Sequence, residues 1–140
     1  MFVDSDIVLK QLDASCWQEF RNLLAEAGWL ESDAPEAAVK GMLTGAAAVG
    51  IEIKGKGLAA VGRAISDGCS DGYIQDVFVL PSCRGMGLGR KVVEALTEIL
   101  KTKGCDWIGL IATPGNEGFY KSMGFEVMDG YTPMLHNIKR

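Results

Sequence analysis

The stretch from Tyr73 to Leu100 constrains the fold most, because a strand, a glycine loop and a helix are predicted there in direct succession. Residues 73–80 read YIQDVFVL; they are rich in β-branched and aromatic side chains and end at Pro81, as a strand does. Residues 88–100 place apolar side chains at helical spacing, with charged residues off that stripe. The stripe consists of Leu88, Val92, Ala95, Leu96 and Ile99. We therefore expect a strand, loop and helix unit at the centre of the fold.

The loop between this strand and this helix favours a bound anion. Its glycines, Gly85, Gly87 and Gly89, remove the side chains that would keep a ligand from the backbone. The first amides of a helix lack helical acceptors, and the helix dipole favours negative charge at the same point. Residues 77–93 contain no acid but three cations, which are Arg84, Arg90 and Lys91. The pattern predicts a site for a phosphorylated ligand; a plain strand-to-helix turn is the alternative.

The glycine spacing excludes two common nucleotide sites. A P-loop requires Gly-x-x-x-x-Gly-Lys and then Ser or Thr, and no hydroxyl residue follows Arg90 or Lys91 where magnesium would need it. A dinucleotide fingerprint requires Gly-x-Gly-x-x-Gly and an acid near the end of the next strand. The glycines here follow Gly-x-Gly-x-Gly, and the strand predicted over 107–112 closes without an acid.

The same stretch resembles the acyl-CoA loop of the GCN5-related N-acetyltransferase (GNAT) superfamily. The pattern of that loop, Gln/Arg-x-x-Gly-x-Gly/Ala, is met by Arg84, Gly87 and Gly89. Residues 77–81, VFVLP, are similar to the superfamily's strand before the loop, and residues 116–125, NEGFYKSMGF, to its later Asn…Phe-Tyr-x-x-x-Gly-Phe block. Within the superfamily, the strand and the short Asn-to-Tyr spacing are similar to glucosamine 6-phosphate acetyltransferases and to small bacterial and plastid relatives.

The resemblance implies an α/β fold of the GNAT type, a mixed central sheet with helices on both faces, that binds acetyl-CoA as a co-substrate and uses no metal. In the superfamily the central strand and the next strand splay apart, so the backbone of residues 77–79 is left to pair with the pantetheine arm. The glycine loop then holds the pyrophosphate. Asn116 has the position of a coenzyme hydrogen bond, although Asn at a helix start is also an ordinary N-cap. The implied coenzyme-binding residues are Val77, Phe78, Val79, Arg84, Gly85, Met86, Gly87, Leu88, Gly89, Arg90, Asn116 and Tyr120.

Two residues are candidates for the chemistry of acetyl transfer. Tyr120 matches the superfamily's thiolate-protonating tyrosine, and a phenol is a weak acid able to deliver a proton to sulfur. Packing of its ring beside Phe119 and Phe125 is the structural alternative. Asp76, the one acid in the central strand, is the candidate base for the incoming ammonium, directly or through water. It could equally cap a backbone group or anchor the acceptor nitrogen. Gln75 stands where some relatives carry glutamate, which argues against a direct base there.

Length and composition are those of one soluble domain. The 140 residues suffice to bury a single core, so residues 1–140 are predicted to form one N-acetyltransferase domain. The net charge of -4 argues against a nucleic-acid surface and is compatible with a cationic amine acceptor. The N-terminal residues lack the pattern of a signal peptide, and no apolar run approaches a membrane span. We expect a cytoplasmic protein, with no membrane partner, whose four cysteines are reduced thiols.

The remaining elements are predicted from periodicity and turn residues. The predicted strands cover 7–10, 46–53, 58–66, 73–80, 107–112, 125–128 and 134–138, the fifth parallel to the central strand and the last two an antiparallel pair. The predicted helices begin at a capping box from Ser15 to Gln18, at Asp33, in the glycine loop and at Asn116, and the first ends at Gly28.

We therefore expect an N-acetyltransferase that moves an acetyl group from acetyl-CoA to a primary amine of a small molecule, by direct attack in a ternary complex. A protein or peptide N-acetyltransferase and a non-catalytic acyl-CoA-binding module are the alternatives. The resemblance also implies a homodimer that shares the C-terminal strands. Residues 111–114 lack the acid that glucosamine 6-phosphate acetyltransferases carry nearby, which argues against an amino-sugar acceptor.

Overall fold

A five-stranded mixed sheet forms the centre of the structure. The computed structural model describes residues 4–137, which fall into two compact units, 4–110 and 111–137, each described by itself. The sheet lies in the first unit and has the order β1-β2-β3-β4-β5. The first four strands are antiparallel neighbours and β5 runs parallel to β4, as predicted. The strands are β1 (Ile7–Gln11), β2 (Ala47–Ile53), β3 (Gly57–Ser66), β4 (Asp71–Val79) and β5 (Trp107–Gly109).

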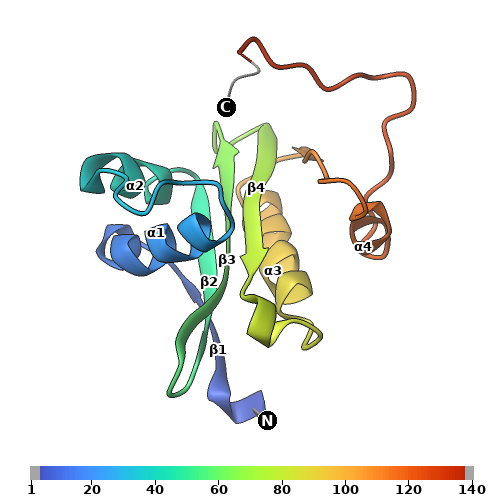
Figure 1. Ribbon diagram of the computed structural model, residues 1–140. Coiled ribbons are helices and arrows are strands. Elements are labelled where there is room, and N and C mark those ends of the chain that lie inside the picture. Colours follow the sequence, from blue (N-terminus) through green and yellow to red (C-terminus); the bar gives the residue numbers. More distant parts are fainter. Residues whose placement is uncertain (1–3, 138–140) are drawn as a thin grey trace. The chain divides into compact units, whose positions relative to one another are not determined.

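Helices cover both faces of this sheet, which confirms the predicted fold class. Figure 1 shows α1 (Trp17–Glu26) and α2 (Glu36–Leu43) on one face and α3 (Leu88–Thr102) on the other. The core beneath α1 and α2 includes the buried side chains of Phe20, Leu24, Val39, Val61 and Phe78. On the other face, α3 buries the apolar stripe that the sequence predicts, including Leu88, Val92 and Leu96. Burial of these two apolar layers is the main favourable contribution to folding.

Two glycines let α3 lie directly on the sheet backbone. A Cβ at Gly62 of β3 would stand 2.6 Å from Cγ1 of Val92, and one at Gly72 of β4 would stand 2.6 Å from Cδ1 of Leu100. Real carbon atoms do not approach so closely, so a side chain at either position would force Val92 or Leu100, or α3 itself, to shift. The helix that follows the glycine loop is therefore held against β3 and β4 at close range.

One predicted helix cap and one predicted helix start are wrong. The capping box from Ser15 does not form, because the Ser15 N–H donates to Oδ1 of Asp13 (2.8 Å) and the Ser15 hydroxyl bonds the same carboxylate. Asp13 thereby caps a short 3-10 turn, Ala14–Cys16, that precedes α1. The second helix starts at Glu36 and not at Asp33, because Pro35 is extended (ψ 140) and disfavours helical torsions in the residue before it.

The predicted C-terminal strand pair is also wrong. Residues 125–128 and 134–137 form no strand, and Ile138 lies outside the described residues. The regular element among residues 111–137 is the helix α4 (Glu117–Lys121). An isolated pair of such short strands is at best marginally stable in water, so apolar alternation alone did not produce one. Within residues 4–137, no helix combines the length and apolarity that a membrane crossing requires.

Candidate active site

The edge of β4 that faces β5 is paired only at its beginning. β4 pairs with β5 at Asp71, Gly72 and Tyr73, and β5 ends at Gly109, earlier than the predicted Ala112. From Ile74 onward, β4 has no partner in β5, and among residues 4–137 it is paired with β3 alone. The backbone of Val77 to Val79 therefore lies in the part of the edge that the resemblance assigns to the coenzyme. Unpaired backbone groups at such an edge are free to bond an extended ligand.

A β-bulge at Asp76 interrupts the pairing of β4 with β3. Arg63 of β3 lies opposite Gln75 and Val61 opposite Phe78, so two residues of β4, Asp76 and Val77, oppose one residue of β3. Asp76 has φ 58 and is the sole non-glycine residue within 4–137 in the left-handed region. The candidate base therefore has a backbone conformation that residues other than glycine rarely adopt.

The Asp76 carboxylate is paired with an arginine that the sequence did not indicate. Nε of Arg63 donates to Oδ2 of Asp76 at 2.6 Å, and Nη2 of Arg63 donates to Oε1 of Gln75 at 3.5 Å. The side chains of Arg63 and Asp76 are 14% and 13% exposed. The pairing of Ser66 with Gly72 places Arg63 opposite Gln75, and the bulge that follows brings Asp76 to the same side.

The glycine loop presents an open backbone at the N-terminus of α3. After Val79 a short 3-10 turn, Pro81–Cys83, leads to Gly85 (φ 83) and Gly87 (φ 76). A Cβ at either glycine would meet nothing within 4 Å. The N–H groups of Leu88 and Gly89 begin α3, so no helical carbonyl is available to them. This loop fits the predicted pyrophosphate, because its open backbone and the helix dipole both favour an anion.

Arg84 lies at the start of the loop, and its side chain contacts the end of β4. Its Nε donates to the carbonyl of Val79 at 3.1 Å, and its guanidinium lies 5.7 Å from the centre of the Phe78 ring. Arg90 instead pairs with Glu94 one turn further along α3, with Nε and Oε1 2.7 Å apart. Part of the positive charge predicted from the sequence is thus offset by an acid just beyond the loop.

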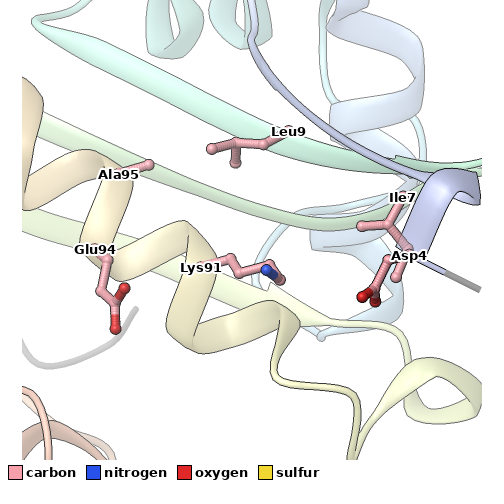
Figure 2. Close-up of a pocket in the computed structure, with 6 residues that line it drawn as sticks. All are labelled: Asp4, Ile7, Leu9, Lys91, Glu94 and Ala95. Atoms are coloured by element: carbon pink, nitrogen blue, oxygen red, sulfur yellow. The ribbon is translucent and has the colours of Figure 1, made fainter.

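A hollow of about 410 Å³ between β1 and α3 is separate from the predicted site. Figure 2 shows Lys91 directed into it, so this predicted cation does not serve the loop. β1 is the edge strand opposite β5, and none of the predicted catalytic or coenzyme-binding residues lines the hollow. Its lining consists of Asp4, Ile7, Leu9, Lys91, Glu94 and Ala95.

The Phe78 side chain lies near the end of β4, on the face of the sheet that α1 and α2 cover. Its ring belongs to the core under these helices and meets the ring of Trp29 edge-on, with centroids 5.8 Å apart. Trp29 follows α1 and is 44% exposed, so one side of its indole is open to solvent.

Tyr120 and Asn116 lie within the second unit. The ring of Tyr120 packs edge-on against Phe119 and Phe125, with centroids 5.0 and 5.9 Å away. Burial raises the pKa of the Tyr120 phenol above its ordinary value of 10.0. Nδ2 of Asn116 donates to Oγ1 of Thr113 at 2.5 Å and makes no capping bond to α4, so the N-cap alternative is not realised by the side chain. Among residues 4–137, no three His, Cys, Asp or Glu side chains form a group that could hold a metal ion.

The mixed sheet, the bulged central strand, the strand edge without a β5 partner and the open glycine loop match the acetyltransferase fold that the sequence resemblance predicts. The family model described as "Acetyltransferase (GNAT) family" matches residues 10–125 of this chain. The chain belongs to the GNAT family of acetyltransferases. The similarity thus covers most of the described sheet, the loop and α4.

Individual relatives match shorter segments. Serotonin N-acetyltransferase 2, chloroplastic, of Oryza sativa subsp. japonica is 47% identical over 66 residues, which are 47% of this chain and 33% of that protein. Glucosamine 6-phosphate N-acetyltransferase of Trypanosoma brucei brucei is 36% identical over 85 residues, which are 61% of this chain and 52% of that protein. The chain therefore spans about a third to a half of these relatives' length.

A solved structure supports the fold over a greater length. The crystal structure of a Trypanosoma brucei acetyltransferase superposes with a TM-score of 0.77 at 24% identity, covering 92% of this chain and 99% of that one. At this identity the likeness shows the fold alone.

Proposed function

We propose that this chain is an acetyl-CoA-dependent N-acetyltransferase that acts on the primary amine of a small molecule. The observation that carries the proposal is the open glycine loop at the start of α3, directly after the unpaired end of β4. The names of the rice and trypanosome relatives support a small amine acceptor, since serotonin and glucosamine 6-phosphate are both small molecules. The acceptor of this chain is an amine of that class.

Different residues of the first unit would bind different parts of acetyl-CoA. The backbone of Val77 to Val79 would pair with the pantetheine arm, and the amides from Gly85 to Arg90 would hold the pyrophosphate. Arg84 keeps the end of β4 and the loop together through its bond to Val79 and adds positive charge beside them. The buried Leu88 side chain anchors the helix start, so only its backbone would contact the ligand.

Three proton transfers accompany the acyl transfer, two from the acceptor nitrogen and one to the leaving sulfur. The ammonium of the acceptor gives one proton to Asp76 or to a water bonded to it, and the freed nitrogen lone pair attacks the thioester carbonyl carbon. A C–N bond forms, the C–S bond breaks, and the sulfur leaves with the electron pair of that bond. The nitrogen, which is cationic after the attack, gives its second proton to solvent. The Tyr120 hydroxyl then gives its proton to the thiolate and is reprotonated from solvent. The products are the N-acetyl amine, CoA with a free thiol, and one proton.

The compartment is proposed from the thiols. Cys16, Cys69, Cys83 and Cys105 are all unpaired in the structure. Unpaired cysteines are typical of a reducing compartment, so we propose that the protein acts in the cytoplasm. Fractionation of cells with a tagged chain tests this directly, since recovery in a secreted or membrane fraction would contradict it.

The proposed activity is tested by binding and then by turnover. Acetyl-CoA is expected to raise the melting temperature, because a ligand at 100 times its dissociation constant stabilises the folded state by about 2.7 kcal/mol, while NAD and ATP should have no effect. Thiol release is then measured with serotonin, glucosamine 6-phosphate, other small amines and peptide N-termini. Release with small amines supports the proposal. Binding of acetyl-CoA without thiol release supports a binding module. Thiol release with peptides alone supports a protein acetyltransferase. No binding of acetyl-CoA refutes the proposed function.

A further inference from the structure

We propose that Arg63 is a positioning residue for acetyl transfer. From β3 it holds the Asp76 carboxylate at the bulge of β4, so that the second carboxylate oxygen, Oδ1, is presented to the acceptor amine. The inference rests on the proposed function, because it gives Asp76 a contact to the acceptor. Arg63 itself acts only through Asp76.

The arginine spans the two residues at the start of the bulge. Its Nε bonds Oδ2 of Asp76 at 2.6 Å and its Nη2 reaches Oε1 of Gln75 at 3.5 Å. The donors of a guanidinium are fixed in one plane, so two bonds from the same group restrict both partners together. A lysine at this position would keep the charge but would lack that geometry.

The bulge needs such a restraint. Asp76 has φ 58, a torsion that residues with a side chain seldom adopt and that persists when the surroundings hold it. The Asp76 side chain is 13% exposed, so without Arg63 its charge would be largely buried and unpaired. The ion pair therefore stabilises the torsion and the position of the carboxylate at once.

The carboxylate lies on the face of the sheet that α3 does not cover. Gly62 points toward α3, since a Cβ there would meet Val92 and Leu96. The neighbouring residues Val61 and Arg63 therefore point to the other face, and Val61 packs there with Phe78 under α1. Asp76, bonded to Arg63, lies on this face beside Phe78. An acceptor would reach Asp76 from this face, beside the part that α1 and α2 cover, because the Asp76 side chain is still 13% exposed and α3 occupies the opposite face.

One oxygen of Asp76 remains available on that face. Within residues 4–137, Oδ1 accepts no hydrogen bond, and it is not among the buried polar atoms that lack a partner. Oδ1 is therefore reachable from solvent, while Oδ2 is occupied by Arg63. An acceptor ammonium would donate to Oδ1 of a carboxylate whose orientation is already set, which lowers the cost of aligning it.

A double-mutant cycle tests the inference, with kcat/KM for the amine measured at saturating acetyl-CoA. Arg63→Gln should lower kcat/KM by roughly 10- to 50-fold, and Asp76→Asn by at least as much. If Arg63 acts only through Asp76, the double variant should fall no more than about threefold below Asp76→Asn. Arg63→Lys should lie between the wild type and Arg63→Gln. The stabilisation by acetyl-CoA should persist in every variant.

Lys10→Gln is the matched control, because it breaks the Lys10–Glu52 pair between two strands of the same sheet. It should leave kcat/KM within about twofold of the wild type. Additive losses in the cycle, wild-type kcat/KM in Arg63→Gln, or an equal loss in Lys10→Gln would overturn the inference. Should Arg63→Gln not fold, Arg63→Lys alone and combined with Asp76→Asn completes the cycle. A wild-type protein that acetylates no amine refutes the proposed function, whereas an active one with additive losses refutes only the role of Arg63.

Discussion

At the scale of single residues, Tyr120 has an environment that suits an acid. Its ring is held between Phe119 and Phe125, and burial raises the pKa of its phenol. A phenol whose pKa lies above the ordinary 10.0 remains protonated at neutral pH, so its proton is available to a leaving thiolate. The same ring packing would exist without catalysis, so a variant that keeps the ring must distinguish the two roles.

Tyr120→Phe should reduce kcat by roughly ten- to a few hundredfold, with the acetyl-CoA melting shift retained. The effect is at the lower end for a general acid, because a thiolate with a pKa near 8.5 leaves readily by itself. Any alkaline limb of the wild-type pH profile above about pH 10 should disappear, since the group that titrates there is removed. Tyr131→Phe is the control, because Tyr131 is 75% exposed. Equal activity and pH profiles in the two variants would assign Tyr120 to packing.

Asp76→Asn should lower the rate most at low pH. A typical acceptor amine has a pKa near 10, so about one molecule in a thousand is neutral at pH 7 and fewer are neutral at lower pH. A base is therefore most needed in acid solution, and kcat/KM is measured from pH 6 to 9. Asp71→Asn, in the same strand, is the control. A pH profile of unchanged shape with a raised acceptor KM would make Asp76 an anchor for the amine and not its base.

At the scale of elements, the loop between β4 and α3 depends on glycine backbone. Gly87→Val should abolish the acetyl-CoA melting shift, because a β-branched side chain at φ 76 is strained and would cover the amides at the start of α3. Gly55→Val places the same strain (φ 79) in the hairpin between β2 and β3 and should keep the shift. Arg84→Ala should weaken binding less than Gly87→Val, since backbone groups supply most of the contacts. An undiminished shift in folded Gly87→Val would contradict the assignment of the loop.

The close packing of α3 on the sheet leads to a separate prediction about the stability of the fold. Gly62→Ala should destabilise the fold by about 1–3 kcal/mol, because the added methyl group would overlap Val92 and Leu96 in a close-packed layer. Gly41→Ala is the matched control, since Gly41 lies within α2 and a Cβ there meets nothing within 4 Å. Alanine in a helix is favoured over glycine by about 0.5–1 kcal/mol, so this variant should be as stable as the wild type or more so. Urea unfolding measures both. Equal stability of the two variants would mean that α3 packs less closely than the structure shows.

At the scale of the whole molecule, exposed apolar side chains of the second unit predict self-association. Residues 111–137 contain seven large apolar side chains that are at least 37% exposed, and Met134 is 86% exposed. Large apolar side chains that are exposed in this number are often covered by another protein chain. The seven are Ile111, Phe119, Val127, Met128, Tyr131, Met134 and Leu135.

We expect a homodimer of twice 15.0 kDa by light scattering at micromolar concentration. Burial of these side chains in a second copy would remove their apolar surface from water. The double variant Met134→Lys/Leu135→Lys should shift the mass to 15.0 kDa. Lys121→Ala is the control, because it changes an exposed residue of α4 outside the apolar set. An active wild-type protein of 15.0 kDa at all concentrations would contradict the prediction.

The sequence by itself determined the order of the elements from β1 to α4 and the loop that begins α3. The strand ending before Pro81, the glycines at 85 and 87 and the apolar stripe from Leu88 are local signals, each set by neighbours within about four residues. A locally predicted element forms in the folded protein when its apolar face is also buried by tertiary packing. Here α3 buries the apolar stripe that its sequence predicts. The local signals also sufficed to predict a mixed sheet with helices on both faces.

Features that depend on pairing between residues far apart in the sequence became known only from the tertiary structure. The bulge adds one residue to β4 and brings Asp76 to Arg63, and no local pattern records which residues a strand opposes after such an insertion. The length of β5 and the absence of strands at 125–128 depend likewise on whether a ladder partner exists. Local propensity sets what a segment favours, whereas cross-strand register and close packing are set by atoms far apart in the chain, and these placed the candidate base in its ion pair.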